Sequence, residues 1–209
     1  MSSRLRRIAV CISTMLIWTS LFAAADLKSA KHAYERKDYA VALKEFMPIA
    51  EQGNAEAQLY LGKMCMLGQG ILKDPDQAVK WFKASAEQGN ADAQFFLGSY
   101  YLLPHLNVAE GVKWLRLSAE QGQQDAQLLL GKSYLQGDQD LPRDPVQADM
   151  WLRLAAKNNL DFYQNELHAA EGQMTSDEVS AGKALAAAWK PKAASARLTR
   201  TGEPPVQKN

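Results

Sequence analysis

Small and hydrophobic residues recur at the same spacing in three segments of the chain. In each segment an alanine and a glutamine are followed by a leucine and a glycine, and then by one further apolar residue. The positions are Ala57, Gln58, Leu61, Gly62 and Cys65; Ala93, Gln94, Leu97, Gly98 and Tyr101; and Ala126, Gln127, Leu130, Gly131 and Tyr134. This spacing places the five side chains on one stripe of an α-helix. The pattern therefore predicts three helices that bury this stripe against their neighbours.

A second set of helices is predicted by a small residue that precedes a tryptophan by three positions. The pairs are Ala78 and Trp81, Gly111 and Trp114, and Ala148 and Trp151. A glycine inside a helix costs about 1 kcal/mol relative to alanine. The recurrent Gly62, Gly98 and Gly131 therefore predict a close approach of the second helix. We expect the indole rings to fill the space beside these glycines.

The connections between the helices recur as well. Glycines follow the first helix at positions 68, 70 and 137, and Asp74 and Asp144, each followed by a proline, supply an N-cap before the second helix. The word Ala-Glu-Gln-Gly then ends the second helix at residues 50–53, 86–89 and 119–122, with a degenerate copy at residues 156–159. The steps of 36, 33 and 37 residues indicate one helix–turn–helix unit that is stacked several times.

These words, taken together, resemble the Sel-1-like repeat family, a relative of the tetratricopeptide repeats. The resemblance is close over residues 50–159 and looser over residues 27–50, where the matching residues are Ala33, Tyr34, Tyr39, Ala42, Leu43 and Phe46. It implies an all-α fold, a right-handed α–α superhelix, or solenoid, of helix hairpins. The second copy lacks the Gly-x-Gly turn and has Leu103, Pro104 and His105 in a shorter connection. We therefore expect its local geometry to differ.

Five regions follow from this organisation. They are a signal peptide at residues 1–25, a leading tetratricopeptide-like helix pair at 26–49, three Sel-1-like repeats at 50–159, degenerate capping helices at 160–190 and a disordered basic tail at 191–209. In the capping region His168 stands where glycine is expected, and Thr175 with Glu178 forms a capping-box pattern before a closing helix.

The first residues are typical of a secretory signal peptide. Arg4, Arg6 and Arg7 precede an apolar run over residues 8–25 that ends in three alanines, so we expect cleavage after Ala25 and a periplasmic or secreted protein. The alternative is an uncleaved anchor, because 18 mostly apolar residues approach the roughly 20 that cross a bilayer. After cleavage no stable membrane span is expected. Cys65 would then be the only cysteine, which excludes an intramolecular disulfide.

Charge does not favour a polyanion as the partner. The full chain carries a formal net charge of +1, and without residues 1–25 it carries −2. Nucleic-acid binding would rest only on the net charge of +4 over residues 190–209, and this segment lacks interleaved aromatic residues. The sequence thus predicts no binding of nucleic acid.

Catalytic and metal-binding patterns are not found in the sequence. His32, His105 and His168 lie in different repeats, and none has a metal-ligand spacing to another histidine or cysteine. Glu51, Glu87 and Glu120 recur at helix ends, which indicates a structural or solvating role. We expect no enzyme activity, no cofactor and no metal. The alternative from the enzyme class is a hydrolase of cell-wall or β-lactam substrates, as proposed for cysteine-rich proteins similar to this family, but their paired cysteines are absent here.

The family geometry implies that the first helices line a concave face. Its predicted binding residues are Glu56, Leu59, Lys63 and Met66; Asp92, Phe95, Ser99 and Leu102; and Asp125, Leu128, Lys132 and Leu135. An apolar row bordered by acids suits a protein or peptide segment with apolar anchors and some basic character. The chain is therefore expected to be an adaptor or regulator. Two alternatives remain open: that these side chains only pack between adjacent first helices, and that the protein is a membrane-anchored spacer. The oligomeric state is not predicted.

Overall fold

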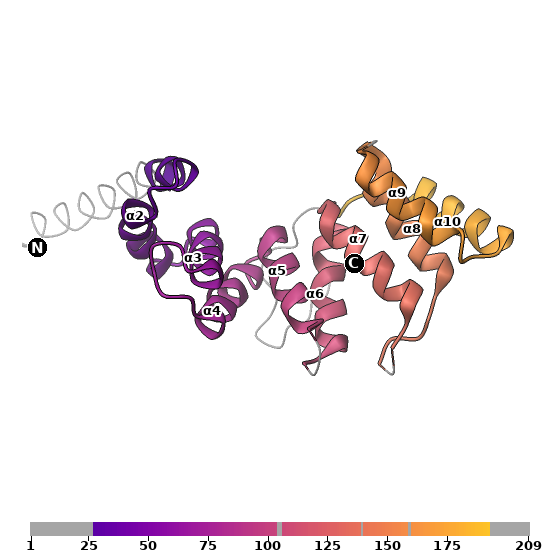
Figure 1. The fold of residues 1–209 in the computed structure, drawn as a ribbon, viewed down its shortest axis with the longest axis horizontal. Helices are drawn as coiled ribbons and strands as arrows, with labels where there is room; N and C mark the ends of the chain where they lie inside the picture. The colour runs from indigo at the N-terminus through magenta and orange to yellow at the C-terminus, as the bar shows by residue number, and fades with distance from the viewer. Residues whose placement is uncertain (1–26, 104–105, 139, 159, 193–209) are drawn as a thin grey trace, which may run out of the picture. The chain divides into compact units, whose positions relative to one another are not determined.

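The computed structural model describes residues 27–103, 106–138, 140–158 and 160–192, and its secondary structure there is α-helical apart from one 3-10 turn and an isolated bridge (Figure 1). The all-α prediction is confirmed. The predicted signal peptide, His105 and the chain beyond residue 192 lie outside the described residues. The chain divides into two compact units, residues 1–81 and 82–209, and the boundary falls within one helix.

The first unit contains a helix at residues 27–35, α2 (Tyr39–Glu51), α3 (Ala55–Leu67) and the start of α4 (Pro75–Ala86). Its first two helices are joined by a tight turn in which Lys37 has a positive φ of 64° and Asp38 caps α2. The core includes Ala33, Ala42, Phe46, Ile49, Ala57, Leu61 and Met64. Trp81 is partly buried and packs against this core.

The second unit continues with α5 (Ala91–Tyr101), α6 (Val108–Glu120), α7 (Gln124–Gln136), α8 (Pro145–Ala155), the 3-10 turn η1 (Ala156–Asn158), α9 (Asp161–Glu171) and α10 (Ser176–Ala188). Helices α5 and α6 pack together, as do α7 and α8, and α6 also packs on α7. We call α3, α5 and α7 the first helices and α4, α6 and α8 the second helices. Trp114 and Trp151 are buried, at 3% and 5% exposed.

The buried glutamine of each first-helix motif forms a hydrogen bond to the alanine of the preceding Ala-Glu-Gln-Gly motif. The Nε2 groups of Gln58, Gln94 and Gln127 donate to the carbonyls of Ala50, Ala86 and Ala119, each over 3.1 Å. Those alanines lie at the ends of the preceding helices, where backbone carbonyls lack intrahelical partners. Each of these carbonyls also accepts the backbone N–H of Gly53, Gly89 or Gly122 over 2.9 Å, so the glutamine adds a second hydrogen bond that ties the next helix to the end of the preceding one. Gln164 repeats the contact with Ala156 over 2.7 Å, so the motif continues into α9.

The glycine that ends each Ala-Glu-Gln-Gly word is required by its backbone conformation. Gly53, Gly89 and Gly122 have φ values of 90°, 90° and 91°. A side chain would be strained in this left-handed region. The predicted role of these glycines as helix terminators is confirmed.

The close approach of the helices at Gly98 and Gly131 is confirmed, but the predicted neighbour is wrong. A Cβ at Gly98 would lie 2.8 Å from the Cγ of Leu115, and one at Gly131 would lie 2.7 Å from the Cγ of Leu152. These leucines directly follow the tryptophans. Each leucine lies four residues after the small residue of the second helix, which is just over one helical turn. Its side chain therefore points more nearly in the same direction as the small residue than the tryptophan side chain three positions after it does. Gly62 is buried in α3.

The closing helices at the C-terminal end pack differently from the repeats. The capping box of Thr175 and Glu178 is present at the start of α10. Helix α10 packs on α8, and a Cβ at Gly182 would lie only 2.4 Å from Oδ2 of Asp149. His168, which stands in the place of a repeat glycine, is largely exposed. Among the helices of the described residues, we find none with the length and hydrophobicity that crossing a bilayer requires.

Candidate functional site

In the first unit, the four predicted binding residues have different environments. Leu59 is buried, with 4% exposed, and Met66 is partly exposed. The ammonium of Lys63 lies 5.3 Å from the centre of the Tyr60 ring, within the range of a cation–π interaction. Glu56 accepts a hydrogen bond from Lys31 over 2.6 Å. Lys63 and Met66 therefore remain accessible on α3, whereas Leu59 belongs to the packed interior.

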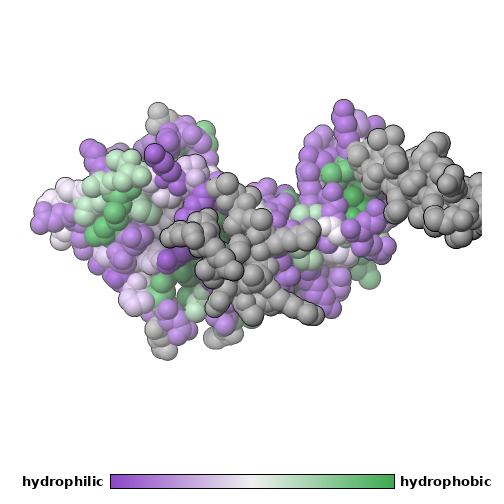
Figure 2. All heavy atoms as spheres, turned by 180° about the vertical axis from the view of Figure 1, so that it is seen from behind, coloured by the Kyte–Doolittle hydropathy of each residue, from purple (hydrophilic) through white to green (hydrophobic). Residues whose placement is uncertain are grey.

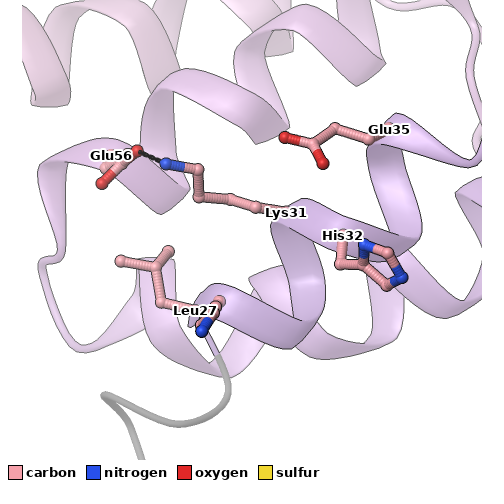
Figure 3. A pocket seen from close by; sticks show the side chains of 6 residues that line it. Leu27, Lys31, His32, Glu35 and Glu56 are labelled. Atoms are coloured by element: carbon pink, nitrogen blue, oxygen red, sulfur yellow. Dashed lines mark hydrogen bonds and ion pairs between the residues drawn. The ribbon is translucent and has the colours of Figure 1, made fainter.

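A groove of about 370 Å³ lies beside Glu56, between α3 and the helix at residues 27–35. It is lined by Leu27, Lys28, Lys31, His32, Glu35 and Glu56. Figure 3 shows Lys31 extending across to Glu56, whereas His32 and Glu35 stand apart from this pair. The hydrogen bond to Glu56, together with its negative charge, raises the pKa of Lys31. Sequence reasoning missed this pair because residues 27–35 carry no copy of the repeat words.

In α5, the predicted residues present an apolar row above the core of the second unit. Asp92 is exposed. Phe95 and Leu102 are partly buried and pack against the core cluster, and the ring of Phe95 lies 5.3 Å from that of Phe96. The hydroxyl of Ser99 donates to the carbonyl of Phe95 over 2.8 Å, so this serine bonds within its own helix.

In α7, the predicted residues face α9. Asp125 accepts a hydrogen bond from the hydroxyl of Tyr163 over 2.5 Å, and this bond raises the pKa of Tyr163 to about 12. Lys132 forms an ion pair with Glu166 over 2.7 Å. Leu128 and Leu135 pack against the cluster that includes Leu167 and Ala170 of α9. These four side chains thus face α9, which lies in the region predicted to hold the degenerate capping helices.

A second cavity, of about 280 Å³, lies wholly within the second unit. Its lining residues come from α5, α6, α7 and the connection after α7: Leu102, Val108, Leu129, Lys132, Ser133, Gln136, Gly137, Asp138 and Leu141. Two of them, Leu102 and Lys132, belong to the predicted binding face. We call this space the Leu129 cavity. Its lining combines apolar side chains, such as Leu102 and Leu129, with polar ones, such as Ser133 and Asp138, and fits a side chain or another small group with an apolar body.

The one cysteine of the described residues, Cys65, is a buried free thiol. Burial raises the pKa of the Cys65 thiol, which makes the nucleophilic thiolate less available. Within residues 27–192, where the structure describes them, no three histidine, cysteine, aspartate or glutamate side chains are grouped so that they could hold a metal ion.

The surface drawn in Figure 2 is mostly hydrophilic where the structure describes it, with hydrophobic residues gathered in a few patches. Several large apolar side chains are exposed in the second unit, among them Leu103 at 52%, Leu106 at 47%, Leu160 at 53% and Phe162 at 58%. Leu103 and Leu106 flank Leu102 and Val108 of the Leu129 cavity in sequence.

Stacked helix hairpins with recurrent caps and partly exposed apolar rows define a helical-repeat protein. The Sel1 repeat profile matches residues 55–90, 91–123 and 124–160, and the chain belongs to the Sel1 repeat family. Sel1 repeat proteins are generally scaffolds for protein–protein interactions and are typically not enzymes. A search of curated proteins found no match.

Solved structures of the same fold support this assignment. The chain is similar to a protective antigen of uropathogenic Escherichia coli that displays an SLR fold, with a TM-score of 0.68 and 28% identity, covering 79% of this chain and 38% of that one. It is also similar to a Sel1 repeat protein from Oxalobacter formigenes, with a TM-score of 0.61 and 30% identity, covering 66% of this chain and 58% of that one. The chain thus spans less than two thirds of either protein. The Sel1-type helical-repeat fold is confirmed.

Proposed function

We propose that this protein is an exported scaffold that binds a segment of a partner polypeptide along its first helices, and that it acts as an adaptor or regulator. The observation that carries the proposal is the pair of matching rows on α5 and α7. An aspartate in the first turn, Asp92 or Asp125, is exposed and is followed three positions later by a partly exposed Phe95 or Leu128. The interaction role of the family supports this interpretation.

The chemistry of these rows defines the partner segment. Apolar anchors on the segment would contact Phe95, and basic residues would lie near Asp92. Asp92 has no ion-pair partner among the described residues, so its charge is available. Asp125 is already bonded to Tyr163 and contributes less. We therefore assign the main contact to α5.

Charge reversal of Asp92 tests the proposal. Asp177 is a matched control, because both residues are exposed and occupy the second position of a helix that has a side-chain N-cap. The partner would be identified by crosslinking in living cells, and its capture would then be compared between Asp92→Lys and Asp177→Lys. We expect Asp92→Lys to lose most of the capture and Asp177→Lys to retain it. Equal capture by the two variants would overturn the assignment of the surface.

Export forms a separate part of the proposal. It rests on Arg4, Arg6 and Arg7, the apolar run over residues 8–25 and the alanines before Asp26. Mass spectrometry of the protein purified from its cell of origin would show a chain that begins at Asp26. A retained N-terminus would instead favour a membrane-anchored protein.

A further inference from the structure

The two units contain equivalent positions that differ in one important respect. The hairpin of residues 27–35 and α2, followed by α3, corresponds to the hairpin of α5 and α6, followed by α7. The turns fix this alignment, since the N–H of the N-cap Asp38 donates to Ala33 and the N–H of the N-cap Asn107 donates to Tyr101. Tyr34, Tyr39 and Tyr60 of the first unit thus correspond to Leu102, Val108 and Leu129 of the second.

In the first unit, the three tyrosine rings fill the space between the hairpin turn and the next first helix. The ring centre of Tyr34 lies 5.5 Å from that of Tyr39 and 5.0 Å from that of Tyr60. Gln69, from the connection after α3, binds two of the hydroxyls. It accepts from Tyr34 over 2.9 Å and donates to Tyr39 over 3.1 Å.

In the second unit, residues at the equivalent positions line the Leu129 cavity. Leu102, Val108 and Leu129 are aliphatic and shorter than tyrosine, and the residue in the place of Gln69 is Asp138. The cavity of about 280 Å³ is thus bounded by the residues whose counterparts supply or bind phenol rings in the first unit. The tyrosines of the first unit therefore indicate that a phenol ring suits these positions.

We propose that the Leu129 cavity binds a tyrosine side chain of a partner polypeptide, with the phenol hydroxyl donating to the Asp138 carboxylate as Tyr34 donates to Gln69. This inference rests on the proposed scaffold function and names the anchor of the bound segment. Aromatic anchors seated in pockets supply much of the binding free energy at protein interfaces. The exposed Asp138 and Asp140 favour basic residues beside the tyrosine. Lys132 is held by Glu166 and does not reverse this preference.

Two-dimensional NMR of the full chain with short blocked peptides tests the proposal. The probes are Lys-Tyr-Lys, Lys-Phe-Lys and Lys-Ala-Lys, each acetylated and amidated. We expect the tyrosine peptide to shift resonances of residues 102, 108, 129 and 138, and to bind several-fold more tightly than the phenylalanine peptide. The alanine peptide should not bind at these residues. Equal shifts with all three peptides would show a general charge interaction and would overturn the proposal.

Two variants of the full chain make this test specific. Leu129→Tyr restores the residue of the first unit and should fill the cavity, weakening the tyrosine peptide at least about tenfold. Asp138→Ala removes the acceptor of the phenol hydroxyl, so it should weaken the tyrosine peptide by a larger factor than the phenylalanine peptide, which loses only the charge attraction. As a change at an exposed residue it keeps the test valid if Leu129→Tyr does not fold. Unchanged affinity of the tyrosine peptide for a folded Leu129→Tyr variant, or equal weakening of the two peptides by Asp138→Ala, would contradict the proposal.

Partner capture separates this inference from the scaffold function. If Asp92→Lys abolishes capture and Leu129→Tyr does not, the anchor is wrong and the scaffold function stands. If neither substitution affects capture, the proposed function fails as well.

Discussion

Single small residues set how closely the helices of this protein approach. If Gly131 carried a methyl group, the nearest atoms would be Leu152 Cγ at 2.7 Å and the carbonyl oxygen of Ala148 at 3.1 Å. At Gly98 the equivalent neighbours are Leu115 and the carbonyl of Gly111, the latter at 3.0 Å. Because backbone atoms lie on the other side of the contact, the helices must move apart to admit a side chain.

Gly131→Ala should therefore destabilise the protein. Overpacking of a tight core contact costs about 1 to 3 kcal/mol, and the gain in helix propensity of about 1 kcal/mol offsets only part of it. Urea unfolding followed by circular dichroism measures the change. Gln136→Ala, at an exposed position of the same helix, is the control and should change stability by less than about 0.5 kcal/mol. A Gly131→Ala variant as stable as the control would disprove the close contact.

At the scale of the helices, the recurrent words specify both the segments and their ends. Asn54, Asn90 and Gln123 cap the first helices, and a buried glutamine four positions after each cap closes the preceding helix. The sequence pattern predicted the helices, the turns after the first helices and the closing glycines, because each depends on local spacing. The predicted neighbour of Gly98, the indole of Trp114, is wrong, because recurrence indicates a close approach without identifying the side chain that makes it.

The environment of the predicted binding residues was harder to derive. The partners of Glu56, Asp125 and Lys132 come from residues 27–35 and from α9, which carry only loose or degenerate copies of the repeat pattern. The Leu129 cavity is lined by aliphatic residues such as Leu102 and Val108, and nothing in the sequence distinguishes these residues from those of a packed core. An alignment of the copies already pairs Tyr60 with Leu129. The sequence alone does not show that Tyr60 contacts Tyr34 of the leading copy, and this contact gives the comparison its structural significance.

The capping box of α10 gives this helix a predicted dependence on pH. The carboxylate of Glu178 accepts a hydrogen bond from the backbone N–H of Thr175 over 2.7 Å, and this bond lowers the pKa of Glu178. Its stabilising contribution is thus present above the ordinary glutamate pKa of about 4.3 and is lost as the pH falls through the lowered value.

We expect Glu178→Ala to be less stable than wild type at pH 7, and the difference to shrink towards pH 3. Urea midpoints measured at the two pH values test this. Asp177→Ala, next to it in the first turn and outside the capping box, is the control and should show the smaller difference at pH 7. A Glu178→Ala deficit that persists unchanged at pH 3 would show that the carboxylate charge is not responsible.

At the scale of the whole molecule, each of the two compact units has its own core and its own candidate surface. The first unit fills the space beside its hairpin turn with tyrosines, whereas the second leaves a cavity at the equivalent residues. The same arrangement of helices thus holds packed tyrosine rings in one unit and an unfilled cavity at the equivalent residues of the other. Changes of this kind give a repeat protein local specificity without altering its helices.

The most direct test of binding along the first helices is site-specific photocrosslinking in the cell of origin. A photoreactive phenylalanine derivative is placed at Phe95 on the first helix α5, or at the exposed Lys113 on the second helix α6. We expect one partner polypeptide to be crosslinked from position 95, with its yield from position 113 at background. Crosslinking of that partner from position 113 with no product at position 95 would contradict binding along the first helices.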